Sequence, residues 1–141
     1  MRTMWHTLKI YLILIPLFFF IDYLWLGKIM VGFYKQELGP LARRVGEDLS
    51  PHLGAALIVY LLIPLGIVLF ALPHVSQTNM PGSALFWGCI YGLVLYGIYD
   101  MTTLAMLAGW SLKLSLLDIL WGGFLCAVIT TLAAYLDRWL G

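Results

Sequence analysis

The sequence predicts an all-α integral membrane protein, a four-helix bundle with short interfacial segments between its first two helices. Hydrophobic residues make up 62% of the 141 residues and charged residues only 11%, whereas a soluble domain carries about a quarter charged residues. The apolar residues form four long runs, each close to the roughly 20 residues that a helix needs to cross a bilayer. Lipid offers no partners to an irregular backbone, so each run is expected to be helical. The length leaves room for one membrane domain, 1–141.

The first predicted span covers about 9–27, between Lys9 and Lys28. Basic residues ahead of an apolar stretch also occur in secretory signals. Bulky residues such as Asp22 and Trp25 stand where a small-residue cleavage site would lie. The segment is therefore expected to be retained as a helix.

The second predicted span covers about 52–72 and ends at Pro73. Ser50 is the expected N-cap, with Pro51 at the first helical position, because a serine hydroxyl caps free amides and proline tolerates that position.

The third and fourth predicted spans cover about 83–108 and 113–136. Their connections, 73–82 and 109–112, are short, so consecutive helices from the second onward are expected to be antiparallel neighbours. A Gly-x-x-x-Gly pair at Gly88 in the third span predicts close helix packing, within one chain or between two.

The stretch 28–51 holds most of the charge outside the spans and contains a Gly39-Pro40 break. Two short interfacial pieces joined at this break fit it better than a fifth span. The distribution of lysine and arginine places this loop in the cytoplasm and both termini outside.

Three acids lie inside the predicted spans, and chain direction places them near one membrane face. Asp22 is near the end of the first span, Asp100 in the later half of the third, and Asp118 near the start of the fourth. At 1.5 Å per residue they lie roughly 6–13 Å inside the boundary. Asp22 and Asp118 each begin an Asp-x-Leu-Trp motif, so the two copies are expected at one depth on antiparallel helices.

An ionised acid within the hydrocarbon costs at least about 2.5–3.5 kcal/mol, so these acids are expected to face the interior and find partners. Tyrosines and a threonine share helical faces with them. The tryptophan one turn after each acid is expected to donate to that acid or to shield it from lipid. The predicted ligand site comprises Asp22, Asp100, Asp118, Tyr60, Tyr96, Tyr99, Thr103, Trp25, Trp121 and His52.

The sequence lacks the motifs of several common binding and catalytic sites. The net charge of +1 argues against a nucleic-acid partner. No histidine-pair metal motif, phosphate-binding glycine loop or G-x-S-x-G elbow is present, and Cys89 and Cys126 lie in apolar runs, as packed thiols do. Three carboxylates with His52 suit a hard cation, but an organic ligand or protons fit equally well, so cofactor and metal stay open.

The leading hypothesis is an acid-lined intramembrane pocket that binds a small polar or cationic solute, or protons, during transport. The lipid bilayer is the expected surrounding, and so small a chain is expected to form a homo-oligomer. One alternative is a membrane-embedded enzyme or accessory factor acting on lipid or isoprenoid substrates. Another is a structural partner subunit, in which the acids only hold helices together.

Five short motifs also resemble those of a known family. They are Asp22-Tyr-Leu-Trp25-Leu-Gly27, Phe33-Tyr34 with Leu38-Gly39, Tyr96-x-x-Tyr99-Asp100-x-Thr102, Gly109-Trp110, and Asp118-x-x-Trp121-Gly122. The pattern resembles the domain-of-unknown-function family 2177, small bacterial predicted membrane proteins. One departure is Thr103, where the family commonly has asparagine. The resemblance implies a multi-pass four-helix protein of the bacterial inner membrane, without an established activity.

Overall fold

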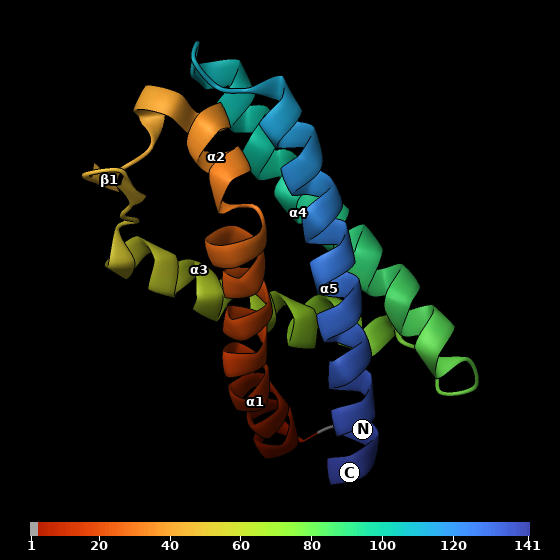
Figure 1. Cartoon of the computed structure of the whole chain (residues 1–141). Helices are drawn as coiled ribbons and strands as arrows, with labels where there is room; N and C mark the ends of the chain where they lie inside the picture. Colours follow the sequence, from red (N-terminus) through yellow and green to blue (C-terminus); the bar gives the residue numbers. More distant parts are fainter. Residues whose placement is uncertain (1–2) are drawn as a thin grey trace.

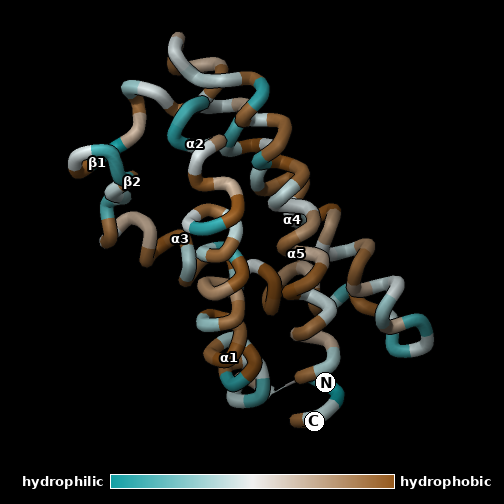
Figure 2. Tube along the Cα trace, in the orientation of Figure 1, coloured by the Kyte–Doolittle hydropathy of each residue, from teal (hydrophilic) through white to brown (hydrophobic). Residues whose placement is uncertain are grey.

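The computed structural model describes residues 3–141 and confirms the predicted all-α fold class (Figure 1). Within these residues, four helices are long and apolar enough to cross a membrane. They are Met4–Ile29, Leu53–His74, Met80–Met106 and Leu112–Leu140. Figure 2 shows hydrophobic residues along most of these helices, with hydrophilic residues in the connection between the first two of them and at the turn that precedes Met80.

The first helix is regular up to its loop-side end and then widens. Helix α1 spans Met4–Tyr23 and begins at Thr3, whose hydroxyl accepts a hydrogen bond from the His6 amide. It continues without a break as the π-helical segment η1, Leu24–Ile29. Segments of π-helix are rare in proteins, and those that occur are often found at functional sites.

The connection between the first two spans contains a helix and a hairpin. Helix α2 spans Val31–Leu38 and a 3-10 turn, η2, follows at Gly39–Leu41. Strands β1, Arg44–Val45, and β2, Asp48–Leu49, then pair antiparallel. Positive φ values at the glycines that follow α2 and β1 allow these reversals. Strands of two residues are too short to give an alternating pattern, so the sequence did not predict them.

Helix α3 spans Leu53–Gly66 and extends through η3, Ile67–Ala71, and η4, Leu72–His74. The expected cap at Ser50 is wrong. The residue before the helix is His52, and its Nδ1 accepts a hydrogen bond from the Ala55 amide at 3.1 Å. The Ser50 amide instead donates to the Arg43 carbonyl and extends the hairpin.

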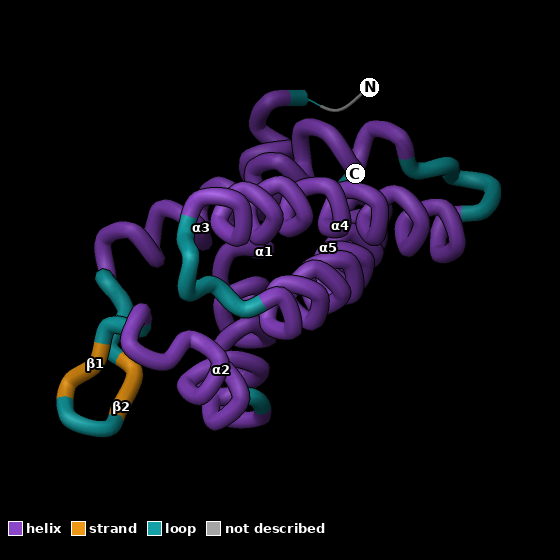
Figure 3. Tube along the Cα trace, turned by 90° about the horizontal axis from the view of Figure 1, so that it is seen from above, coloured by secondary structure: helices purple, strands orange, loops and turns teal. Residues whose placement is uncertain are grey.

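Helix α3 crosses the other helices steeply, as Figures 1 and 3 both show. The expectation that the second and third spans would run antiparallel is therefore wrong, although the two spans do contact each other. Its C-terminal segments η3 and η4 meet α4, whereas α3 itself packs mainly on α1. Leu53 and Leu57, in its first turns, are 78% and 58% exposed in the isolated chain, as lipid-facing side chains would be.

Helices α4, Met80–Met106, and α5, Leu112–Leu140, form the most extensive contact in the chain, and they run antiparallel. Glycines of α4 let the two backbones touch. A Cβ at Gly88 would lie 2.5 Å from the Cys126 carbonyl oxygen, and a Cβ at Gly92 would overlap the Gly122 carbonyl. The Gly-x-x-x-Gly contact is thus made within one chain.

Replacing Gly92 with alanine is expected to lower the free energy of unfolding by about 1–3 kcal/mol, because the new methyl group meets backbone that cannot move aside. Gly97→Ala in the same helix is the matched control, since a Cβ there has nothing within 4 Å. Thermal unfolding in detergent measures both variants. Equal melting temperatures for the two would contradict the close backbone contact.

Candidate functional site

The three acids lie on helix ends that meet at one end of the molecule. Asp22 is next to the last residue of α1, Asp118 is in the second turn of α5, and Asp100 is in the last third of α4. Figure 1 shows these ends gathered near α2. We call Asp22, Asp100 and Asp118 the acid layer.

Asp22 has a hydrogen-bond donor for each carboxylate oxygen. The Tyr60 hydroxyl donates to Oδ2 at 2.8 Å, and the Trp121 indole Nε1 donates to Oδ1 at 3.1 Å. The residue is only 6% exposed. Its donors come from α3 and α5, so this one side chain of α1 ties three helices together.

Asp118 accepts a hydrogen bond from a residue of α2. The Tyr34 hydroxyl donates to Asp118 Oδ1 at 2.9 Å, and the Trp25 indole donates to the Tyr34 oxygen at 3.1 Å. Trp25 and Trp121 stack face to face, with ring centroids 4.3 Å apart and planes 4° from parallel. Each indole is therefore hydrogen-bonded to the acid of the other Asp-x-Leu-Trp motif. Trp121 donates directly to Asp22, and Trp25 reaches Asp118 through Tyr34. Donation to the acid one turn before is not observed.

Asp100 differs from the other two acids. Its side chain is fully buried, and neither carboxylate oxygen has a hydrogen-bond partner among the described residues. The Asp118 carboxyl group is close enough to interact with it. Carboxylates only accept hydrogen bonds, so a bond between these two acids requires a proton on one of them.

The other predicted site residues divide into two groups. Tyr60, Trp25 and Trp121 join the hydrogen-bonded network described above, and the Tyr96 ring packs on Gly122 beside it. Tyr99, Thr103 and His52 lie outside that network. The Thr103 hydroxyl donates to the Tyr99 carbonyl at 2.7 Å, the Tyr99 ring is 58% exposed, and His52 is an exposed helix cap.

The sequence-based site omitted Tyr34, which connects Trp25 to Asp118. Tyr34 is 6% exposed. Burial, reinforced by the charge of Asp118, raises the pKa of its phenol above the ordinary value, so it stays a donor at neutral pH. It belongs to the Phe33-Tyr34 motif, and that was the one signal that pointed to it. Its contact with α5 depends on how α2 folds back, which spacing along the chain does not reveal.

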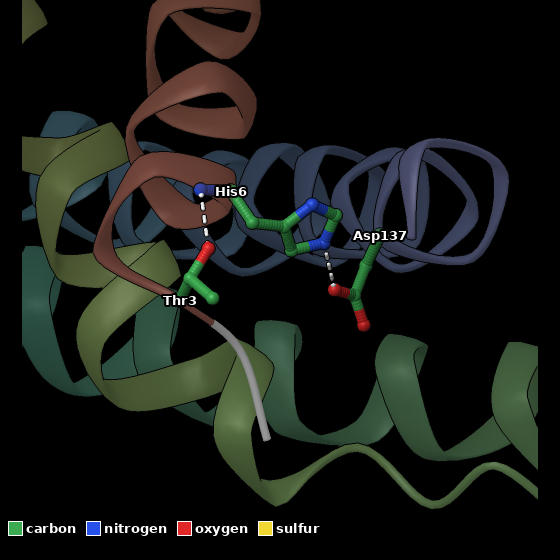
Figure 4. A network of polar contacts seen from close by, with 3 residues as sticks. All are labelled: Thr3, His6 and Asp137. Carbon is green, nitrogen blue, oxygen red and sulfur yellow. Dashed lines mark hydrogen bonds and ion pairs between the residues drawn. The ribbon is translucent and has the colours of Figure 1, made fainter.

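A second polar contact closes the opposite end of the molecule. His6 Nε2 and Asp137 Oδ1 lie 2.7 Å apart, each side chain 13% exposed, and join the start of α1 to the end of α5 (Figure 4). A cleft of about 560 Å³ borders this pair, and an apolar cavity of about 420 Å³ lies near Leu136. Neither is lined by a residue of the acid layer.

Among residues 3–141, no three His, Cys, Asp or Glu side chains are arranged to hold a metal ion. The carboxylate of Asp22 is directed to Tyr60 and Trp121 rather than toward the other acids. His52 lies at the exposed start of α3. The acid layer therefore offers two neighbouring carboxyl groups, those of Asp100 and Asp118, rather than a cage of three acids and a histidine.

A family model described as "Predicted membrane protein (DUF2177)" matches residues 7–135, nearly the whole chain. The chain belongs to the DUF2177 family. This confirms the resemblance seen in the motifs and, with the four apolar helices, makes the DUF2177 chain a membrane protein. No curated protein and no solved structure matches it.

Tyr60→Phe is expected to lower the stability of this DUF2177 protein by about 1–2 kcal/mol, because Asp22 keeps its burial and loses a donor. Tyr135→Phe is the matched control, since that hydroxyl makes no hydrogen bond within residues 3–141. Thermal unfolding in detergent gives the comparison. Identical melting temperatures would mean that Asp22 does not depend on Tyr60.

Proposed function

We propose that the acid layer binds a small polar or cationic solute, or protons, as part of transport across the bacterial inner membrane. The observation that supports this most is Asp100, a fully buried acid with no hydrogen-bond donor among the described residues. The charged group that interacts with it is another acid, Asp118.

The energetics favour a positively charged occupant. An unpaired charge inside a membrane protein costs several kcal/mol, and interhelical hydrogen bonds contribute about 0.6 kcal/mol on average. The free energy gained from helix association is therefore smaller than the cost of burying a charged Asp100. A proton or a cation shared by Asp100 and Asp118 would remove the penalty, because it supplies the missing partner to both carboxyl groups.

The roles of the residues follow from their contacts. Asp100 and Asp118 would bind the occupant, and Tyr34 and Tyr96 would border it. The stacked indoles of Trp25 and Trp121 would separate the acids from lipid on the α1 side. A complete pathway through so small a chain would be shared between copies in a homo-oligomer.

A structural role is the second candidate, and it is supported for Asp22 alone. Both oxygens of Asp22 already have donors, from α3 and α5. A buried acid that is fully hydrogen-bonded in this way fixes helix positions and needs no further ligand. The three acids are thus proposed to divide between one structural and two ligand-binding side chains.

Transport is tested in proteoliposomes that contain the purified full chain. Flux of protons, alkali cations and small ammonium ions is measured in wild type and in Asp100→Asn and Asp118→Asn. Each variant is expected to reduce the flux at least tenfold, because the binding charge is lost. Asp48→Asn in the exposed hairpin is the control. Wild-type flux in both site variants would overturn the proposal.

Thermal stability separates the two roles. Asp100→Asn is expected to raise the free energy of unfolding by about 1–3 kcal/mol, because the asparagine amide can donate to Asp118 and the pair no longer needs a shared proton or cation. Asp22→Asn is expected to lower it by a similar amount, because it weakens two hydrogen bonds. Melting in detergent provides the readout. Destabilisation by both changes would assign Asp100 a structural role like that of Asp22.

A further inference from the structure

Helix α2 lies against the end of α5 where the acid layer begins, and its one buried residue reaches Asp118. We infer that α2 is a lid over the Asp100–Asp118 side of the acid layer, held closed on α5 by Tyr34 and Glu37. What the lid would admit rests on the proposed function. The lid itself rests on the contacts and backbone geometry described next.

Three side chains of α2 hold it to the first two turns of α5. Tyr34 donates to Asp118 at 2.9 Å, and Glu37 Oε1 accepts from the Ser111 hydroxyl at 2.6 Å. The Lys113 ammonium lies 5.8 Å from the centre of the Phe33 ring. These contacts are polar and local, and breaking them would release α2 without separating the transmembrane helices.

Both ends of α2 depart from regular helix, as a hinged element requires. At its start, Met30 stands between the π-helical η1 and α2, with φ −113° and ψ 13°. At its end, Gly39 has φ +55° and ψ −129°, a conformation open mainly to glycine, and Pro40 follows. Arg44 donates to the carbonyls of Lys35 and Gly39, so the hairpin would move together with α2.

Tyr34 connects the lid to the site. Its hydroxyl accepts from Trp25 and donates to Asp118, so it occupies an oxygen of the acid that neighbours Asp100. Closing the lid therefore satisfies Asp118 through Tyr34, whereas opening it leaves that oxygen free for an occupant. An eight-residue helix is marginally stable by itself, which makes α2 the element expected to open first.

Amide hydrogen exchange of the full chain in phosphatidylethanolamine–phosphatidylglycerol nanodiscs tests whether Tyr34 holds the lid closed. Tyr34→Phe is expected to speed amide exchange in residues 31–38 about fivefold, because the loss of one hydrogen bond changes the opening equilibrium by about that factor. Exchange in α4 and α5 is expected to stay unchanged. Tyr135→Phe is the control and is expected to match wild type. Unchanged exchange in Tyr34→Phe, or a rise shared by α4 and α5, would overturn the lid.

Modification by a water-soluble carbodiimide and an amine, located by mass spectrometry, tests whether the lid covers the site. Tyr34→Phe is expected to speed modification of Asp118 in step with the faster exchange, and to leave Asp22 unchanged. Faster exchange without faster modification of Asp118 would overturn the covering role. If both tests give the expected results while Asp100→Asn and Asp118→Asn both transport normally, the lid is supported and the transport proposal is overturned.

Discussion

The stack of Trp25 on Trp121 is the interaction on which the loop-side half of the molecule depends. It brings the end of α1 against α5 with ring centroids 4.3 Å apart. In this arrangement the Trp121 indole donates to Asp22 and the Trp25 indole donates to Tyr34. The stacked pair thus stands between the two acids, with one indole bound to Asp22 and the other bound to Asp118 through Tyr34.

The acids that result are chemically unequal, although the sequence presents them alike. Asp22 has donors from two other helices, Asp118 has one from α2, and Asp100 has none among the described residues. This gradient follows from position. Asp22 faces the hydroxyl of Tyr60 and the indole of Trp121, whereas the neighbour of Asp100 on α5 is another acid, Asp118.

Composition and apolar run length predicted the fold class, because the need to satisfy backbone groups in lipid leaves few alternatives. Chain direction likewise predicted that the acids share one end. The exchange of partners between the two Asp-x-Leu-Trp motifs was not predictable, since it depends on how two helices rotate against each other. Neither was the crossing of α3, because a short loop sets only the distance between two helix ends. The role of Tyr34 depends on the way α2 folds back onto α5, and no periodic pattern in the sequence indicates that packing.

The two attachments between α1 and α5 have a consequence for how this protein can move. Asp22 with Trp121 joins these helices at one end, and His6 with Asp137 joins them at the other. A slide by one helical turn, about 5.4 Å, would break both attachments at once. The relative position of α1 and α5 along their axes is therefore fixed at both ends, so the proposed transport would require movements that keep this pair together, such as displacement of α2.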